Sequence, residues 1–273
     1  MKKVLLAFDG SHFSEGAFNF ARGLNELQPV LLTGLFVPQI NYANLWSYAN
    51  AAGGPSFIPL LEDQDSEVIQ ENIERFEKLC KQNSIEYRVH KEFFDFALPQ
   101  LRKETRFADL AILSSETFYQ NVGIGMPNEY LKDVLHSAEC AIVVVPEKYE
   151  FPKTNILAFD GSESSVFAIK QFVYLFPELC NNETLLVYAD EAGNPFPEST
   201  SMEELATRHF ANLTFFKLGV EPREHFASWI SDSKSAILVS GSFGRSSLSQ
   251  LLKRSFVFDV IRDHRLPVFI THR

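Results

Sequence analysis

The chain has 273 residues, of which 45% are hydrophobic and 22% charged, a usual globular mixture rather than the composition of a disordered protein. The net charge of -10 and the pI near 5.2 argue against polyanionic partners such as nucleic acids or anionic membranes. Three cysteines without a C-x-x-C pair predict reduced thiols, and no apolar stretch approaches the ~18 residues of a membrane span. We therefore expect a soluble, cytoplasmic protein.

Strand and helix patterns alternate along the first half. Lys3–Phe8 is a continuous apolar run, which is typical of a buried parallel strand, and Ser11 or Ser14 can cap the helix that follows. We expect the inner face of that helix to carry Ala17, Phe20, Ala21, Leu24 and Leu27. Further strands are predicted at Val30–Val37, Glu86–Val89, Leu110–Leu113 and Ala141–Val145. Further helices are predicted at Glu67–Gln82, Leu98–Thr105 and Leu131–Ser137, the first of them with Val68, Ile69, Ile73, Phe76 and Leu79 at helical spacing.

The second half follows the same order after a short linker, Pro146–Lys153. Its predicted strands are Asn155–Phe159, Leu185–Ala189, Thr214–Lys217, Ala236–Ser240 and Pro267–Thr271. Its predicted helices are Ser164–Phe176, Met202–Asn212 and His225–Ser231. Such alternation favours a mainly parallel sheet with helices on both faces.

The two halves are copies of each other. Leu5–Ser11 spells Leu-Leu-Ala-Phe-Asp-Gly-Ser and returns almost unchanged as Ile156–Ser162, at an offset of 151 residues. A gapless match then aligns Asp109–Glu147 with Ser235–Arg273 at an offset of 126. The period is far longer than that of a solenoid, so each copy is expected to be a whole domain. We predict an α/β protein of two tandem five-stranded parallel-sheet domains, with bounds 1–147 and 153–273.

The fall in offset means that the first copy contains about 25 residues that the second lacks. The stretch Pro38–Asp65 has no clear partner in the second half and is rich in turn residues, so it is predicted to be a long loop or lid.

The strongest chemical signal follows strand Ala236–Ser240. There the chain reads Gly241-Ser242-Phe243-Gly244, and glycines at this place let the backbone approach a ligand and turn its N–H groups toward an anion. Ligands of open α/β sheets usually lie outside the carboxyl ends of the strands. The alternative is a plain Gly-Ser turn at a strand end.

Asp9 and Asp160 end the first strand of each copy. There a carboxylate can accept hydrogen bonds from a ribose or a base amino group. Alternatively, the Asp and the Ser cap the next helix and the Gly makes the turn.

The second half resembles the ATP-binding members of the universal stress protein family, whose motif is Gly-x2-Gly-x9-Gly-Ser/Thr after strand four. Here the motif reads Gly241-x2-Gly244-x9-Arg254-Ser255, and the resemblance covers nearly the whole chain as two copies. It implies a Rossmann-like fold of the adenine nucleotide alpha hydrolase type. It also implies that Ala141–Val145 pairs with Pro267–Thr271 in an intramolecular pseudo-dimer, which could associate further into a homodimer.

The same resemblance implies a site for an adenine nucleotide (ATP, ADP or AMP, with or without Mg) in the second half. Ala158, Asp160 and Tyr188 would line the nucleoside side, and the phosphates would be held by Gly241, Ser242, Gly244, Arg254 and Ser255. Arg254 departs from the family motif, because its side chain could contact a phosphate or fill the space that a phosphate needs. In the first half, Phe118 and Glu129 stand where Gly244 and Ser255 would be, so we expect that copy not to bind nucleotide.

The chain has no His-Glu-x-x-His, Walker A or Gly-x-Ser-x-Gly signature, so neither catalytic residues nor a metal site are predicted. We expect a stress-response protein that binds an adenine nucleotide without turning it over. The alternative is an interaction or signalling protein with a vestigial site and unidentified protein partners.

Overall fold

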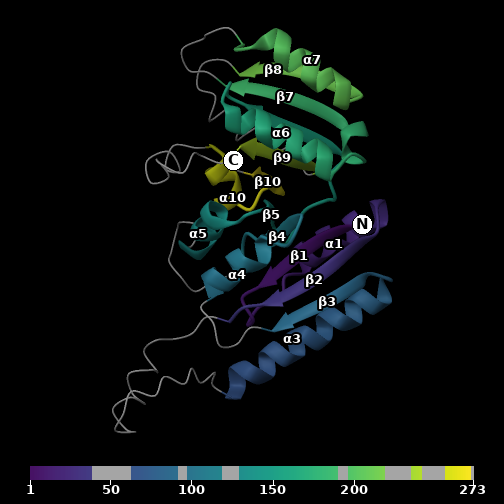
Figure 1. The fold of residues 1–273 in the computed structure, drawn as a ribbon, viewed down its shortest axis with the longest axis vertical. Helices are drawn as coiled ribbons and strands as arrows, with labels where there is room; N and C mark the ends of the chain where they lie inside the picture. Colours follow the sequence, from purple (N-terminus) through teal and green to yellow (C-terminus); the bar gives the residue numbers. More distant parts are fainter. Residues whose placement is uncertain are drawn as a thin grey trace.

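The computed structural model describes residues 1–38, 63–91, 97–118, 129–189, 196–218, 235–241 and 256–271. Ten strands form a single sheet in the order β3-β2-β1-β4-β5-β10-β9-β6-β7-β8 (Figure 1). Nine neighbouring pairs make up that order, and all are parallel except the central pair of β5 with β10. The protein is therefore an α/β fold in which two five-stranded parallel sheets continue into each other.

The elements of the first half are β1 (Lys2–Phe8), α1 (Glu15–Leu27), β2 (Val30–Phe36), α3 (Asp63–Gln82), β3 (Glu86–Lys91), α4 (Ala97–Thr105), β4 (Leu110–Ser114), α5 (Glu129–Ser137) and β5 (Ala141–Val145). Those of the second half are β6 (Thr154–Phe159), α6 (Glu163–Leu175), a short 3-10 helix (Leu179–Asn181), β7 (Glu183–Ala189), α7 (Ser199–His209), β8 (Asn212–Leu218), β9 (Ala236–Gly241), α10 (Phe256–Arg262) and β10 (Val268–Thr271).

The predicted strand pairing at the junction is confirmed. Val144, Val143 and Ile142 of β5 lie opposite Val268, Phe269 and Ile270 of β10 in antiparallel register. β5 and β10 are the last strands of the two halves, and because they pair with each other neither is left as an exposed apolar edge. The halves thus form the expected intramolecular pseudo-dimer.

Each face of the sheet has one continuous apolar core that runs through both halves. Helices α1, α3, α6 and α7 pack on one face, and α4, α5 and α10 pack on the other. Alternate residues of a strand point to opposite faces, so Leu157 and Phe159 enter the first core while Ile156 enters the second. Because the sheet and both cores are shared, the bounds 1–147 and 153–273 of two separate domains remain a prediction.

Three sequence-based expectations about helices need correction. Leu27 is exposed, because it lies in the last turn of α1 and borders a small cavity shared with Leu175 rather than the sheet. Val68 is exposed because its neighbour Ile69 faces the sheet, and successive helical residues point about 100° apart. The buried stripe of α3 is Ile69, Ile73, Phe76 and Cys80. Finally, α3 begins at Asp63, so the predicted loop is at least three residues shorter at that end.

Residues 39–62 of the predicted loop, and the predicted helix His225–Ser231, lie outside the described residues. All three cysteines are free thiols, as expected. Among the described residues, none of the helices is long and apolar enough to cross a bilayer.

Candidate functional site

The carboxyl ends of β6, β7 and β9 carry the predicted site residues that the structure describes. Ala158 and Asp160 stand at the end of β6, Tyr188 near the end of β7, and Gly241 at the end of β9, which is the neighbour of β6. The other four, Ser242, Gly244, Arg254 and Ser255, lie outside the described residues. The structure therefore brings half of the predicted set to one edge of the second sheet.

Asp160 is exposed at that edge. Its Oδ1 accepts a hydrogen bond from the backbone N–H of Ser162 (2.9 Å), and no other described residue forms a hydrogen bond or ion pair with the carboxylate. Gly161 makes the turn with φ of +82°, a conformation that L side chains rarely adopt. The cap of α6 is the Ser162 hydroxyl, which accepts from the N–H of Ser165 (3.1 Å). The aspartate therefore supports the turn but is not the cap, which corrects one of the two readings.

Ala158 and Tyr188 lie on opposite faces of the sheet. Tyr188 pairs with Phe159 across β6 and β7, and its ring is buried against Phe159 and Phe196. Ala158 is partly buried and packs toward the other core. A ligand contacting both side chains would therefore have to sit at the edge of the sheet, where the two faces meet.

Gly241 makes a close backbone contact within the protein. A Cβ placed on it would lie 2.4 Å from the carbonyl carbon of Ser164 and 2.6 Å from the nitrogen of Ser165, both in the first turn of α6. Real Cβ atoms essentially never lie this close to other heavy atoms, so position 241 has no room for a side chain. Packing of β9 against α6 therefore accounts for a glycine at this position without any ligand.

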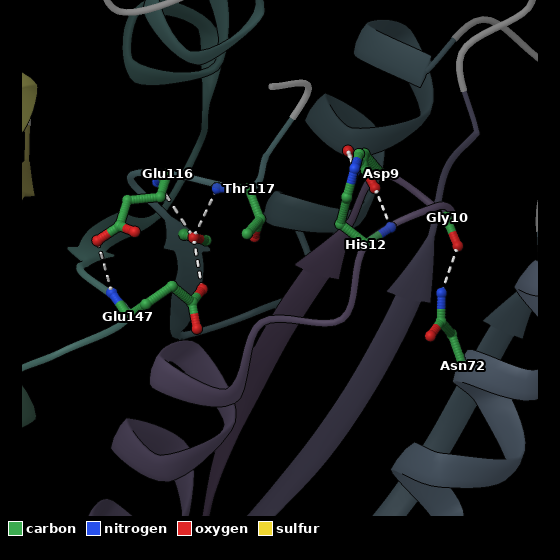
Figure 2. A network of polar contacts seen from close by, with 8 residues as sticks. Asp9, Gly10, His12, Asn72, Glu116, Thr117 and Glu147 are labelled. Atoms are coloured by element: carbon green, nitrogen blue, oxygen red, sulfur yellow. Dashed lines mark hydrogen bonds and ion pairs between the residues drawn. The ribbon is translucent and has the colours of Figure 1, made fainter. Parts of the chain in front are cut away.

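The same edge of the first half is closed by its own side chains (Figure 2). Asp9 is only 4% exposed, and its two carboxylate oxygens contact the backbone N–H and the Nδ1 of His12, each at 2.8 Å. Asn72 of α3 donates to the carbonyl of Gly10 (2.8 Å), which fastens the turn after β1. Phe118, the repeat equivalent of Gly244, is 3% exposed and lies in the apolar core on the face covered by α4, α5 and α10.

Glu147 fills the N-terminus of α1 in the first half. Its carboxylate accepts hydrogen bonds from the hydroxyls of Ser14 and Ser114, the latter at 3.0 Å, and from the backbone N–H of Gly16 at 3.0 Å. A negative charge at this place interacts favourably with the unpaired N–H groups of the helix. An anion position that a ligand could use is thus taken by the protein's own carboxylate.

Sequence reasoning missed His12 and Glu147 as partners at this edge. A signal was present, because the capping serine follows Asp9 by five positions in the first copy, at Ser14, and follows Asp160 by only two in the second, at Ser162. The three extra residues contain His12, which turns back onto Asp9. For Glu147 the offset of 126 pairs a carboxylate with a guanidinium, Arg273, so the copies differ in charge at this position.

Among the described residues, no three His, Cys, Asp or Glu side chains gather in a way that could hold a metal ion. The burial of Cys80 and Cys140 raises the pKa of each thiol to about 12, so neither is ionised near neutrality.

No protein-family model and no curated protein matches the chain, whereas solved structures match along its whole length. A universal stress protein from Archaeoglobus fulgidus superposes with a TM-score of 0.72 over 99% of this chain and 98% of that one, at 16% sequence identity. The chain has the fold of a tandem universal stress protein. A protein of unknown function from Pseudomonas aeruginosa PAO1 matches with a TM-score of 0.57, at 8% identity, over 99% and 92% of the two chains.

The universal stress fold also matches the cytoplasmic domain of a prokaryotic cation chloride cotransporter. The TM-score is 0.52 and the identity 11%, over 98% of this chain and 94% of that one. At such identities the similarity establishes the architecture of the chain and leaves its ligand to be argued from the site.

Proposed function

We propose that the protein binds one adenine nucleotide per chain, at the carboxyl edge of β6, β7 and β9, and does not turn it over. The observation that carries the proposal is the contrast between the two equivalent aspartates. Asp9 is buried and contacts His12 through both oxygens, whereas Asp160 is exposed and one of its oxygens has no hydrogen bond or ion pair with a described residue. Only the second copy therefore presents a carboxylate that can accept hydrogen bonds from a nucleoside.

The fold gives this edge its chemistry. The carboxyl ends of parallel strands meet there; Gly241 ends β9, and the sequence that follows carries Gly244 with several serines and basic residues. Backbone N–H groups and hydroxyls of such a loop suit a phosphate, and the nucleoside would lie toward Asp160. Ser242, Arg254 and Ser255 complete the proposed phosphate side, and Ala158 and Tyr188 the nucleoside side.

Calorimetric titration with AMP, ADP and ATP tests the proposal, with the two aspartates as a matched pair. Asp160→Ala is expected to abolish or strongly weaken binding and to change stability by only about 0.5 kcal/mol, because the side chain is exposed. Asp9→Ala is expected to keep nucleotide affinity although it destabilises the protein by about 1–3 kcal/mol through the loss of buried hydrogen bonds. A stoichiometry of two nucleotides per chain would show that the first copy is misread.

A second pair of variants tests the phosphate side. Gly244→Val is expected to abolish binding by blocking the approach of the backbone to the ligand. Substitution of Phe118, its repeat equivalent, should leave nucleotide affinity unchanged.

The second candidate is an interaction protein without a nucleotide, in a stress-response or signalling role. Two observations favour it: the backbone contact at Gly241 requires a glycine for packing alone, and the same fold occurs in a transporter's cytoplasmic domain. The titration separates the candidates, since the absence of binding by any of the three nucleotides supports this second one.

A further inference from the structure

The linker between the halves lies directly on helix α1. A Cβ on Gly23 would be 2.3 Å from the ring of Phe151, and one on Gly16 would be 2.2 Å from the carbonyl oxygen of Pro146. Phe20 contacts the rings of Tyr149 and Phe151, and the Tyr149 hydroxyl donates to the carbonyl of Gly16 (3.2 Å). The segment Tyr149–Lys153 thus covers the side of α1 that faces the second half, and we call this place the linker seat.

A pseudo-twofold axis relates the two halves, so the linker seat on α1 has an equivalent position on α6. The capping serines Ser14 and Ser162 align the two helices at an offset of 148, so Gly23 corresponds to Gln171 and Leu27 to Leu175. At the strand starts, Asp109 corresponds to Ser235, whose carbonyl accepts the N–H of Lys153 (2.8 Å) where the linker leaves its seat.

This second seat is an open groove. A cavity of about 780 Å³ lies between one side of α6, marked by Phe167, Gln171 and Leu175, and the start of β5 in the first half. Among the described residues, no segment fills it in the way that the linker fills its equivalent.

The groove combines an aromatic wall with acidic and polar groups. Phe167 and Leu175 are partly buried, and Asp109 carries a carboxylate without an ion pair among the described residues. Arg102 also lines the groove and shares the carboxylate of Glu139, at 3.3 Å, with Arg106, at 2.7 Å. The groove therefore has room for an aromatic side chain, and the carboxylate of Asp109 is the acidic group beside that space that has no ion pair among the described residues.

We propose that this groove, between α6 and the start of β5, is a docking site for an extended segment of a partner protein that presents an aromatic residue followed by proline and a basic residue. The segment Phe151-Pro152-Lys153 shows the chemistry, because it occupies the equivalent seat on α1. Neither Asp160 nor Gly241 lines the groove, although Gly241 is the strand partner of Thr271, which does; the peptide and nucleotide titrations therefore test the two proposals by separate measurements.

The test uses a fluorescein-labelled peptide with the sequence of residues 148–154, titrated with the full-length protein and followed by fluorescence anisotropy. Saturable binding is expected, and the same peptide with alanine in place of Phe151 should not bind. Phe167→Asp is expected to weaken affinity by roughly tenfold or more, since the loss of an aromatic anchor commonly has at least this effect. Tyr174→Asp is the control, because Tyr174 also lies on α6 but is 59% exposed and does not line the groove.

A third variant, Gln171→Gly, copies the linker seat and is expected to tighten binding of the peptide. Circular dichroism and thermal melts establish that each variant is folded before its affinity is compared. Absence of binding to the wild type, binding to Gln171→Gly alone, or equal weakening by Phe167→Asp and Tyr174→Asp would overturn the proposal. So would concentration-dependent dimerisation that Phe167→Asp abolishes, because the groove would then be an interface between copies of this chain.

Discussion

Val143 of β5 lies directly opposite Phe269 of β10, and these two residues are also equivalent to each other in the repeat, at the offset of 126. A residue that faces its own equivalent marks the pseudo-twofold axis. The axis therefore passes between Val143 and Phe269, and the joint between the halves is a continuation of the sheet. On one side of it Phe269 packs edge-on against Phe172 and Phe176 of the second half, with ring centroids 5.5 and 5.7 Å away.

Removal of the Phe269 ring should destabilise the whole molecule. Phe269→Ala deletes a fully buried ring beside the axis, which typically costs about 3–5 kcal/mol of unfolding free energy. Because the sheet and both cores run through the junction, we expect a single cooperative transition in urea. Phe107→Ala is the control, since that ring is 64% exposed and its loss should change stability by about 0.5 kcal/mol or less. Two separate transitions in the wild type would contradict the shared core.

Glu147 should hold the linker to the start of α1. Glu147→Ala removes the acceptor of three hydrogen bonds, two from serine hydroxyls and one from a backbone N–H, and should lower the unfolding free energy by about 1.5–3 kcal/mol. Glu147→Gln keeps one carbonyl oxygen as acceptor and should lose less. Glu150→Ala, in the same linker but exposed, serves as control. Equal effects of Glu147→Ala and Glu150→Ala on urea unfolding would mean that the contacts at the helix start contribute nothing net.

The order of the elements and the joint between the halves could be predicted from the sequence, because they depend on patterns that extend over many residues. The repeat places Ala141–Val145 and Pro267–Thr271 in equivalent positions, and apolar terminal strands need a partner, so their pairing follows. The contacts of single side chains were less predictable. Leu27 fits the helical pattern and is nevertheless exposed, because its burial depends on where α6 of the other half lies.

The candidate site was predictable only in part, for a physical reason. The Asp-Gly-Ser match suggests that Asp9 and Asp160 have one role, but three extra residues bring His12 onto Asp9 and leave Asp160 exposed. Similarly, Gly241 fits a ligand loop by motif, while its contact with the backbone of α6 depends on the packing of two distant segments. A sequence motif shows only which residue type a position carries. A ligand loop and the packing against α6 both require a glycine at 241, so the motif alone cannot tell the two apart.

The ion pairs of Glu139 should make stability depend on pH in the acid range. A hydrogen bond from Arg106 is the main cause that lowers the pKa of Glu139 from 4.5 to about 2; burial opposes it, and the charges of Arg106 and Arg102 add to the lowering. A carboxyl group whose pKa is lower in the folded state stabilises the fold above its unfolded pKa, and this contribution disappears as the pH falls toward the folded value.

We therefore expect Glu139→Gln to be less stable than wild type at pH 7, with the difference shrinking below about pH 4.5 and vanishing near pH 2. The measurement is urea unfolding of both proteins at a series of pH values. Glu204→Gln is the control, because Glu204 is exposed on α7 and has no ion pair among the described residues. A difference between Glu139→Gln and wild type that stays constant from pH 7 to pH 2 would show that the ion pairs do not stabilise the fold.

Arg254 should decide which nucleotide the second half accepts. It stands where the family motif has glycine, and a guanidinium on a three-carbon stem would occupy the space of the outermost phosphate. We expect wild type to bind AMP or ADP more tightly than ATP, and Arg254→Gly to strengthen ATP binding by restoring that space. If the guanidinium instead contacts a phosphate, the same variant should weaken affinity by about 1.5–3 kcal/mol, the usual contribution of a charge-assisted hydrogen bond.

Asn128→Gly, at the repeat-equivalent position of the first half, is the matched control and should leave every affinity unchanged. Calorimetry with the three nucleotides distinguishes these outcomes, and equal affinities for AMP and ATP that Arg254→Gly does not alter would place the side chain outside the site.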